Sequence, residues 1–489
     1  MTDHLTGLLR EAARDRPELA LGVSGDLRPL ADLLAAAERR AAVLLDRGLQ
    51  PGDRVALVAP SSTDYLVHVI AGILAGLPTA LVNPTYPTEL LASMVDDIDP
   101  AAVVVGAGVD PAIAGGRGWG DVTGALADSG ASSDRSVAPR ELPGAAAGRL
   151  DTALFLHTSG TTGQPKFCAL SHEYLLRLGA RFAQELGLSA ADRVLAPLPM
   201  FHINPLGYGF FGGLAARADV VSVAAFSASG FWPLVRRERI TALVLHAPPV
   251  EILKRATTAS DAEGHRVRTM FYADGDFMRT FGIGRATSGY GSTESAGLSH
   301  LRTWTSGDEL PRDASRRAGR GRDDVEWRLD ESGGLLVRGT APGVLFSGYW
   351  RDGAVRPALD EDGWFETGDL GRLDEDGGLV FLERRAESIR VKGEFVPIPF
   401  VEERLGSIAA LDDLAIWRRR GDLVDDEVTL YAVCDALPVD EIRAVAAELP
   451  AFMRPVAVAR IERMPRDAAA GKVQRRLLDG ADVLEWVEL

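Results

Sequence analysis

To about residue 300, the chain alternates short apolar runs with longer amphipathic stretches. Helical patterns such as LVHVIAGILAG and HEYLLRLGARFAQEL lie between runs that are almost entirely apolar. The apolar runs are RVALVAP (54–60), TALVNP (79–84), AAVVVGAG (101–108), TALFLHTSG (152–160), DRVLAP (192–197), DVVSVAAF (219–226) and ITALVLHAP (240–248). Strands without polar alternation are typical of parallel sheets that are buried on both faces. The pattern therefore predicts an α/β fold with parallel-rich sheets covered by helices.

The pattern changes after about Pro311. Short runs such as GGLLVRG and FSGYW are separated there by glycine and aspartate turns, which indicates an antiparallel or distorted barrel-like section. From Glu387 onward, FVEERLGSIA and VDEIRAVAAEL predict helices, while DLAIWRRR and VTLYAVCDA predict strands of a small α+β unit. We place the boundary near Arg384, which predicts a large domain of residues 1–384 and a small domain of residues 385–489.

Composition argues against several classes of protein. The formal net charge of −16 is unsuited to general nucleic-acid binding, which needs a basic surface. No apolar run is long enough to span a bilayer, and the acidic residues of MTDHLTGLLREAARDRPELA are unlike a signal peptide. The two cysteines, Cys168 and Cys434, are too few for a disulfide framework or a cysteine-based metal site. These features predict a cytoplasmic protein without a membrane partner.

Lysine is scarce in this chain. Of the 53 lysine and arginine residues, the only lysines are Lys166, Lys254, Lys392 and Lys472. Arginine is a planar cation, whereas lysine is a compact charge on a flexible stem, so a mobile charge beside a phosphate or carboxylate favours lysine. Three of the lysines lie in segments with other functional signals, namely TSGTTGQPK, IRVKGEFVP and PRDAAAGKVQ. We expect the remaining one, Lys254, to tolerate arginine.

The segment LFLHTSGTTGQPK (154–166) carries the sharpest functional signal. An apolar run leads into small residues, where Gly160 and Gly163 permit backbone conformations that bring amide groups together around an anion. Hydroxyl donors and a mobile charge are added by Thr158, Ser159, Thr161, Thr162 and Lys166. The spacing differs from that of a P-loop. A solvated linker rarely follows a buried strand so abruptly, so we interpret the segment as a phosphate-binding loop.

TSGTTGQPK resembles the phosphate-loop signature of the adenylate-forming (AMP-binding) enzyme superfamily, which includes acyl-CoA synthetases, peptide-synthetase adenylation domains and luciferases. Further segments resemble other motifs of that superfamily, in the same order along the chain: VNPTYPTELL (82–91), PMFHINPLG (199–207), YGSTE (290–294), WFETGDLG (364–371), ERRAESIRVKGEFVP (383–397) and PRDAAAGKVQRR (465–476). The resemblance covers essentially the whole chain. GEFVP and FHINP are more similar to the carnitine-CoA-ligase-like branch than to peptide-synthetase domains.

The resemblance implies a role for each matching residue. Tyr290 would stack on adenine, while Asp369 and Arg384 would bind the ribose hydroxyls. Glu294 and Thr162 would hold Mg²⁺, a hard cation suited to carboxylate and phosphate oxygens. Lys472 would lie near the substrate carboxylate and the α-phosphate, where it would stabilise charge as pyrophosphate leaves. The nucleotide would also be contacted by Thr158, Ser159, Gly160, Thr161, Gly163, Lys166, Gly291 and Thr293.

The resemblance also implies where the acyl group and the thiol bind. His202 in PMFHINPLG would line both pockets, and it is counted among the catalytic candidates as a pocket residue and not as a base. After a rotation of the small domain, Gly393 and its neighbours would line the thiol channel. Lys392 would then lie in the loop that faces the active site.

The chain departs from the family pattern at several points. Phe167 replaces the usual glycine after Lys166, Ala386 replaces the usual Asp or Lys at the hinge, and Gly471 is preceded by one extra residue. The segment FYADGDFMRTFGIGRATSGYGSTE is shorter than in relatives by about three helical turns. Its aspartates at positions 274 and 276 stand where small neutral residues are expected. Asp274 and Asp276 are either solvated turn residues or part of a remodelled pocket for an amine or another small polar group.

The predicted function is that of an ATP-dependent ligase that requires Mg²⁺. A small carboxylic acid would attack the α-phosphate to give acyl-AMP and pyrophosphate, and a thiol, most simply coenzyme A, would then take the acyl group. Alternatives are acyl transfer to a carrier protein, and activation of nitrite for diazotisation of an amine in secondary metabolism. A catalytically degenerate nucleotide-binding protein is the non-enzyme alternative, and the intact Lys472, Glu294 and Asp369 argue against it.

Overall fold

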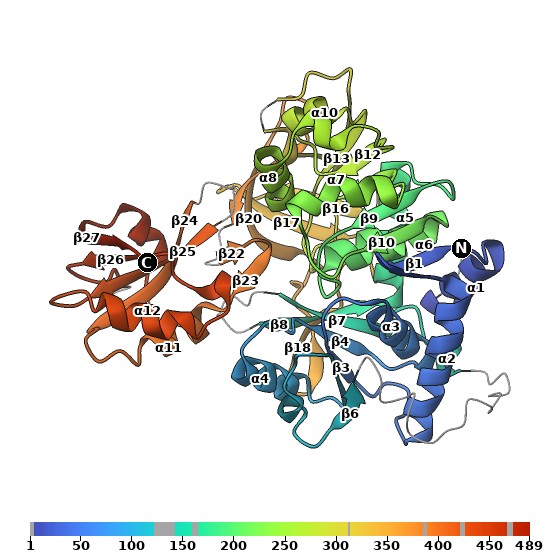
Figure 1. Cartoon of the computed structure of the whole chain (residues 1–489), viewed down its shortest axis with the longest axis horizontal. Helices are drawn as coiled ribbons and strands as arrows, with labels where there is room; N and C mark the ends of the chain where they lie inside the picture. Colours follow the sequence, from blue (N-terminus) through green and yellow to red (C-terminus); the bar gives the residue numbers. More distant parts are fainter. Residues whose placement is uncertain are drawn as a thin grey trace. The chain divides into compact units, whose positions relative to one another are not determined.

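The computed structural model describes residues 4–121, 142–158, 165–311, 313–384, 389–420, 426–466 and 473–489 (Figure 1). The described residues fall into two compact units. The larger unit is drawn from Met1–Pro84, Leu91–His157 and Phe167–Glu383, and the smaller from Thr85–Leu90, Thr158–Lys166 and Arg384–Leu489. Each unit has a hydrophobic core of its own.

The larger unit is built around a 13-stranded sheet of order β16-β17-β20-β21-β15-β14-β13-β12-β11-β9-β10-β1-β2. Neighbouring strands from β1 to β13 run parallel, and those from β13 to β15 run antiparallel. The strands are β1 (Ala20–Val23), β2 (Asp26–Pro29), β9 (Arg193–Ala196), β10 (Asp219–Ser222), β11 (Ala242–Val244), β12 (Thr269–Phe271), β13 (Arg285–Tyr290), β14 (His300–Thr305), β15 (Arg317–Gly321), β16 (Val325–Leu329), β17 (Gly334–Gly339), β20 (Phe365–Leu373) and β21 (Leu379–Arg384). The antiparallel section predicted after Pro311 therefore continues the parallel sheet, in an open strand order.

A second sheet of eight strands has the order β19-β18-β8-β7-β4-β3-β5-β6. Its strands are β3 (Val55–Val58), β4 (Thr79–Val82), β5 (Ala102–Val105), β6 (Gly118–Asp121), β7 (Thr152–Thr158), β8 (Lys166–Ser171), β18 (Gly348–Arg351) and β19 (Ala354–Arg356). β3 pairs in parallel with β4 and β5, and β4 pairs in parallel with β7. These are strands that the apolar runs predict.

The central strands of the large sheet are buried on both faces because their side chains alternate between two hydrophobic cores. In β9, Val194 and Ala196 belong to one core, while Leu195 belongs to the other. β12 alternates in the same way, with Phe271 in the first core and Met270 in the second. Successive side chains of a strand point to opposite faces of the sheet, so both positions must be apolar. The burial explains the continuous apolar runs in the sequence.

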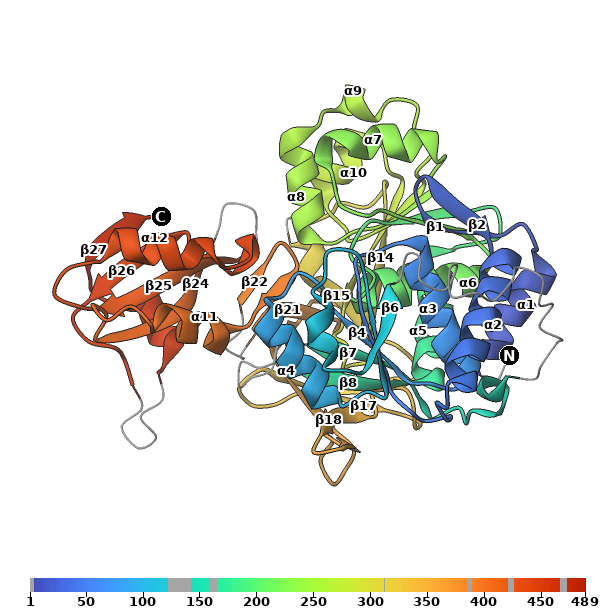
Figure 2. The same cartoon turned by 60° about the horizontal axis from the view of Figure 1, so that its bottom comes forward.

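Helices cover the strands on both sides (Figure 2). They are α1 (Leu5–Asp15), α2 (Leu30–Asp46), α3 (Thr63–Ala75), α4 (Thr88–Ile98), α5 (His172–Leu186), the π-helix η3 (Asn204–Phe211), α6 (Gly212–Ala216), α7 (Ala228–Arg237), α8 (Ala247–Ala256), α9 (Ala259–Ala262) and α10 (Gly275–Phe281). Several begin and end at clear signals. The Ser171 side chain caps α5 by accepting from the Tyr174 amide, and Gly187 ends the helix with a φ of 62°. Short 3₁₀ turns lie at η1 (Pro111–Ala114), η2 (Pro143–Ala146) and η4 (Ala314–Arg316).

The smaller unit has a four-stranded sheet of order β24-β25-β26-β27 beside a two-stranded hairpin, β22-β23. Its elements are β22 (Ile389–Val391), β23 (Glu394–Val396), α11 (Ile398–Leu405), β24 (Asp413–Arg420), β25 (Asp426–Val433), α12 (Val439–Ala447), η5 (Ala451–Met453), β26 (Ala457–Ile461), η6 (Arg475–Gly480) and β27 (Val483–Glu488). Trp417 of β24 is fully buried, and its indole donates to Asp479 Oδ1 at 2.7 Å. Both predicted helices and both predicted strands are present.

The predicted α/β fold class is confirmed, with large sheets and packed helices in the larger unit and an α+β arrangement in the smaller one. Across the part of the chain that the structure describes, none of the helices combines the length and the hydrophobicity that crossing a bilayer requires.

Candidate active site

Two of the predicted nucleotide-binding residues meet in the larger unit. Tyr290 is the last residue of β13, and its hydroxyl donates to Oδ2 of Asp369 in β20 at 2.5 Å. Both residues are buried, and the Tyr290 ring packs against Phe381 with ring centroids 5.7 Å apart. A carboxylate has about four acceptor positions, so Asp369 can accept further hydrogen bonds beyond the one from Tyr290. The pair combines an aromatic ring with a carboxylate, the groups suited to a purine and to hydroxyls.

The loop after β13 carries Gly291, Thr293 and Glu294. A Cβ at Gly291 would lie 2.0 Å from the carbonyl oxygen of Gly297, so this turn accepts only glycine. The backbone oxygen of Thr293 accepts a hydrogen bond from the Tyr174 hydroxyl at 2.9 Å. Tight backbone packing and this bond hold the loop that places Glu294.

The Glu294 side chain is half-buried, and its Oε1 atom accepts a hydrogen bond from the Tyr349 hydroxyl at 3.2 Å. Burial raises the pKa of Tyr349 well above its usual value, and the Glu294 charge raises it further. The phenol therefore stays protonated and acts as a donor to the carboxylate. Sequence reasoning missed Tyr349, which it placed only in the strand FSGYW. A partly buried tyrosine in a strand usually has a partner for its hydroxyl, and this is the one signal that could have drawn attention to Tyr349.

The described residues contain no group of three or more His, Cys, Asp or Glu side chains arranged to hold a metal ion. Mg²⁺ usually takes one or two carboxylates together with substrate phosphates and water. Glu294 fits that donor set. Thr162, the other predicted metal-binding residue, lies outside the described residues.

The predicted phosphate loop is described only at its two ends. Thr158 is the buried last residue of β7, and Lys166 is the first residue of β8. The residues between them that the sequence singles out, Ser159, Gly160, Thr161, Thr162 and Gly163, lie outside the described residues. The same holds for Lys472 and Ala386.

Three other predicted residues lie at the start of the segment Arg384–Leu489 of the smaller unit. The backbone of Arg384 ends β21, while its side chain is outside the described part of the structure. Lys392 and Gly393 form the turn of the β22–β23 hairpin, with φ angles of 53° and 87°. A positive φ is readily adopted by glycine and rarely by lysine, which makes Lys392 an unusual residue at this turn.

His202 lies just before η3 in a cluster of rings. Its ring centroid is 4.6 Å from that of Phe201 and 6.4 Å from that of His157. His157 Nε2 in turn accepts a hydrogen bond from the backbone amide of Asn83 at 3.2 Å. These contacts bring together the PMFH segment, the end of β7 and the NP segment, which are far apart in the sequence. η3 is a π-helix, a rare form that is frequent at functional sites.

Aromatic side chains fill the space behind this cluster. Tyr208 of η3 stacks on Phe182 of α5 with centroids 4.9 Å apart, and its ring edge meets Phe271 at 5.3 Å. The Tyr208 hydroxyl donates to the carbonyl oxygen of Gly297 at 2.8 Å. Tyr208 therefore spans from the helix after His202 to the loop that carries Glu294.

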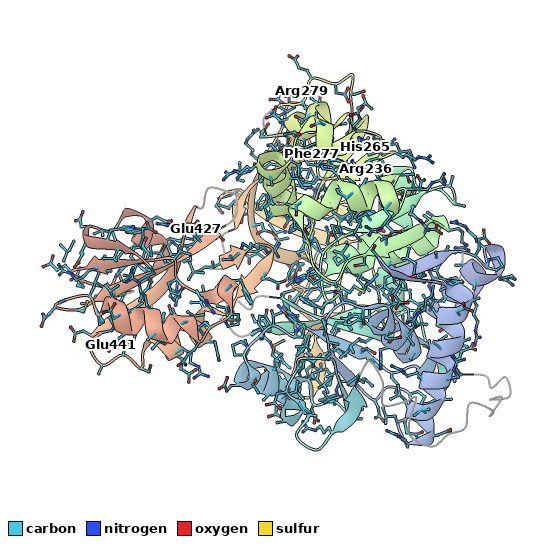
Figure 3. The ribbon with its side chains drawn as sticks, in the orientation of Figure 1. Arg236, His265, Phe277, Arg279, Glu427 and Glu441 are labelled. Atoms are coloured by element: carbon cyan, nitrogen blue, oxygen red, sulfur yellow. The ribbon has the colours of Figure 1, made fainter. Side chains whose placement is uncertain are left out.

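Asp274 and Asp276, the two aspartates predicted to be either turn residues or pocket residues, both make contacts within the chain. Asp274 caps α10 by accepting from the Phe277 amide at 2.8 Å, and its other oxygen pairs with Lys254 at 3.1 Å. Asp276 is 72% exposed and pairs with Arg279, which extends away from the molecule in Figure 3. Both carboxylates are already used in contacts within the chain. These contacts are those of turn and capping residues, and a pocket for an amine stays a prediction.

Lys254, which the sequence leaves without a role, has two partners. Its Nζ atom lies 3.0 Å from Glu251 Oε1 and 3.1 Å from Asp274 Oδ2. The charges of both carboxylates outweigh burial and raise the pKa of Lys254. The lysine joins α8 to the start of α10, so its role is structural.

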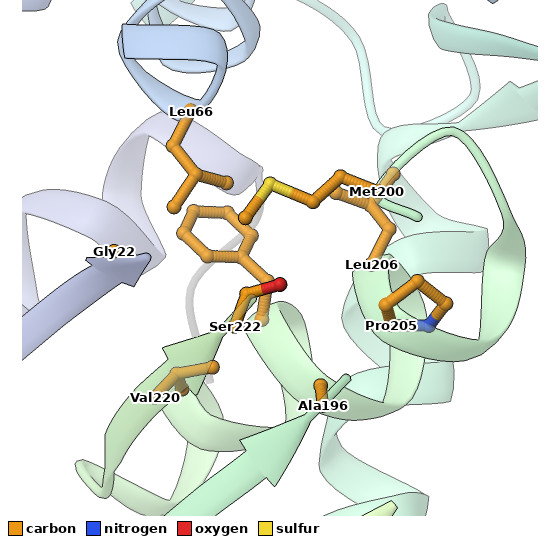
Figure 4. Close-up of a pocket in the computed structure, with 9 residues that line it drawn as sticks. Gly22, Leu66, Ala196, Met200, Pro205, Leu206, Val220 and Ser222 are labelled. Carbon is orange, nitrogen blue, oxygen red and sulfur yellow. The ribbon is translucent and has the colours of Figure 1, made fainter. Parts of the chain in front are cut away.

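A small cavity lies close to η3 but holds none of the predicted site residues (Figure 4). It has room for about one water molecule. Its only polar side chain is Ser222, whose buried hydroxyl has no hydrogen-bond partner among the described residues. The cavity is otherwise lined by Gly22, Leu66, Ala196, Met200, Pro205, Leu206, Phe210 and Val220.

Comparison with known proteins identifies the family of this chain. The model of the AMP-binding enzyme family matches residues 12–350. The long-chain-fatty-acid–CoA ligase FadD13 of Mycobacterium tuberculosis is 28% identical over 502 residues, which cover 96% of this chain and 97% of the relative. Oxalate–CoA ligase of Arabidopsis thaliana is 28% identical over 516 residues, which cover 98% of each.

Among solved structures, o-succinylbenzoate CoA synthetase (MenE) of Bacillus subtilis shares the fold, with a TM-score of 0.84 and 23% identity over 98% of this chain and 99% of that one. The family model covers well over half of the chain. The chain therefore belongs to the AMP-binding enzyme family, and the predicted enzyme class, an ATP-dependent and AMP-forming ligase, is confirmed.

Proposed function

We propose that this ligase activates a small carboxylic acid with ATP, releases pyrophosphate, and passes the acyl group of the acyl-AMP to coenzyme A. The observation that carries the proposal is the hydrogen bond of 2.5 Å between Tyr290 and Asp369. Tyr290 lies four residues before Glu294 in the chain. This contact joins an aromatic ring to the Asp369 carboxylate, and the Glu294 carboxylate follows on the loop after Tyr290. The relatives named above are CoA ligases, which supports coenzyme A as the acceptor.

The residues present fit ATP and Mg²⁺. Asp369 has acceptor capacity for ribose hydroxyls, and the Tyr290 ring is an apolar surface at the end of a strand. The Glu294 carboxylate would provide a hard ligand for Mg²⁺, which would add positive charge beside the phosphates. The same proposal includes nucleotide contacts by the phosphate-loop residues between positions 158 and 166. It also includes contacts by Thr158, Lys166, Gly291, Thr293 and Arg384.

The smaller domain, residues 385–489, is proposed to be a lid that carries Lys472. A compact cation next to the α-phosphate would lower the barrier to attack by the substrate carboxylate. Rotation of the smaller domain would then bring Gly393 to the thiol. The larger domain, residues 1–384, would bind ATP and the acid throughout.

The aromatic packing supports a small acid. Tyr208, Phe182 and Phe271 occupy the space between η3, α5 and the end of β12, and Tyr208 closes it by bonding to Gly297. His202 lies at the start of the same segment. A bulky acyl chain that extended between η3, α5 and the end of β12 would have to displace these buried rings.

Release of AMP from ATP, measured with a panel of short acids in the presence of coenzyme A, tests the proposal. We expect AMP and an acyl thioester to form together, with at least one acid. AMP without thioester would point to a carrier protein as the acceptor, and AMP that forms only with nitrite and an arylamine would point to diazotisation. No AMP with any of these substrates would overturn the proposal.

The matched variant Asp369→Asn tests the assignment of the ribose site. It keeps an oxygen that can accept from Tyr290 but removes the charge. We expect the KM for ATP to rise on the order of tenfold, since a hydrogen bond to a charged group contributes about 1.5–3 kcal/mol. An unchanged KM for ATP would remove Asp369 from the nucleotide site.

A further inference from the structure

The segment Phe346–Tyr349 belongs to the run FSGYW, and the functional assignments above give it no role. Its backbone joins β8, the strand that directly follows the predicted phosphate loop in the sequence. The Ser347 amide donates to the Ala169 carbonyl at 2.9 Å, and Tyr349 pairs with Cys168 in the antiparallel ladder between β18 and β8. The segment is therefore fixed to the strand that leaves the phosphate loop.

The same segment binds Glu294 at two points. The Phe346 amide donates to the backbone oxygen of Glu294 at 3.3 Å, and the Tyr349 hydroxyl donates to Glu294 Oε1 at 3.2 Å. One bond fixes the backbone of the residue, and the other fixes its carboxylate. Glu294 is thus connected to β8 through a chain of four residues.

Tyr349 is itself held in place. Its ring packs edge-on against Phe346 with centroids 4.9 Å apart, and Phe346 packs in the same way against Phe365 at 5.3 Å. The Arg351 guanidinium lies 5.5 Å from the Tyr349 ring centroid. A ring enclosed on several sides has little rotational freedom, so its hydroxyl points in a fixed direction.

We propose that Tyr349 is a positioning residue that orients the Glu294 carboxylate toward the Mg²⁺ of the bound nucleotide. The proposal rests on the proposed function, because it takes Glu294 as the ligand for that cation. A donor on Oε1 restricts rotation of the Glu294 carboxylate and so sets the direction of both of its oxygens. Partners that orient metal ligands in this way typically change metal affinity by about 10–100-fold when they are removed.

Tyr349→Phe is the variant that tests the proposal, because it keeps the ring and removes only the hydroxyl. Tyr174→Phe is the matched control. Tyr174 is buried, and its hydroxyl also binds the Glu294 loop, but at the Thr293 backbone oxygen and not at the carboxylate. Binding of ATP to the full chain is measured by titration calorimetry over a series of Mg²⁺ concentrations, and again with EDTA.

We expect the Mg²⁺ concentration for half-maximal enhancement of ATP binding to rise about tenfold in Tyr349→Phe. ATP binding in EDTA and the thermal midpoint should stay close to those of the unaltered chain, and Tyr174→Phe should keep the original Mg²⁺ dependence. An unchanged Mg²⁺ dependence in Tyr349→Phe would overturn the proposal, as would an equal shift in both variants, which would indicate general loosening of the loop. If the unaltered chain binds ATP without any response to Mg²⁺, the proposed function fails and the role of Tyr349 fails with it.

Discussion

Arg322 is a buried cation that holds the far end of the loop carrying Glu294. Its side chain is 3% exposed and binds Asp324 through two bonds of 2.9 and 2.7 Å. It also donates to the carbonyl oxygens of Ala296 and Leu298 at 3.1 and 3.0 Å. Burial by itself raises the pKa of Asp324, but the hydrogen bonds and charge of Arg322 outweigh it and lower that pKa. The Asp324 carboxylate therefore stays charged at neutral pH.

Removing Arg322 should therefore destabilise the chain strongly. Arg322→Met leaves a buried carboxylate without its main partner and removes the donor that the Ala296 and Leu298 carbonyls share, and we expect a loss of about 3–5 kcal/mol in the free energy of unfolding. Arg338→Met is the control, since Arg338 pairs with Glu326 at an exposed position, where a pair contributes about 1 kcal/mol or less. Urea unfolding followed by tryptophan fluorescence measures both. Equal losses in the two variants would contradict the expectation.

At the scale of elements, the start of α10 depends on one side chain. Asp274 supplies the N-cap of the helix and also pairs with Lys254 from α8. We expect Asp274→Ala to lower stability by about 1–2 kcal/mol, because it removes both contacts. Lys254→Arg is the matched control. It should lower stability less than Asp274→Ala, since a guanidinium can still donate to the Glu251 and Asp274 carboxylates. Thermal unfolding compares them, and an Asp274→Ala variant as stable as the unaltered chain would refute the capping role.

The elements differ in how well the sequence predicts them. Strands such as β3 and β9 are predictable because burial on both faces leaves a continuous apolar run. β27 is missed because its residues are mostly exposed, and it exists as a strand by pairing with β26. The site shows the same division. Motifs such as YGSTE are local and can be read directly, whereas the bond from Tyr349 to Glu294 joins residues 55 positions apart and leaves no local pattern.

At the scale of the whole molecule, three buried histidines link folding to pH. Burial lowers the pKa of His300 to about 3 and that of His172 to about 4. The pKa of His68 is also lowered to about 3, mainly by burial and further by the nearby Arg40 charge. All three are therefore neutral in the folded chain at pH 5, although a histidine in an unfolded chain has a pKa of about 6.5.

The sign of the pH effect follows from these shifts. Below about pH 6.5 the unfolded chain binds protons that the folded chain cannot, so stability falls as the pH decreases toward the folded pKa values of about 3 to 4. Each buried histidine should lower the free energy of unfolding by about 2 kcal/mol at pH 5 relative to pH 7. His300→Phe removes one of them, and it should lower the slope of the free energy of unfolding between pH 6 and pH 5 by about 1.2 kcal/mol per pH unit. Urea unfolding of both chains at each pH gives the two slopes, and their difference does not depend on any constant packing cost of the substitution. Parallel slopes would mean that His300 is not a buried neutral group in the folded chain.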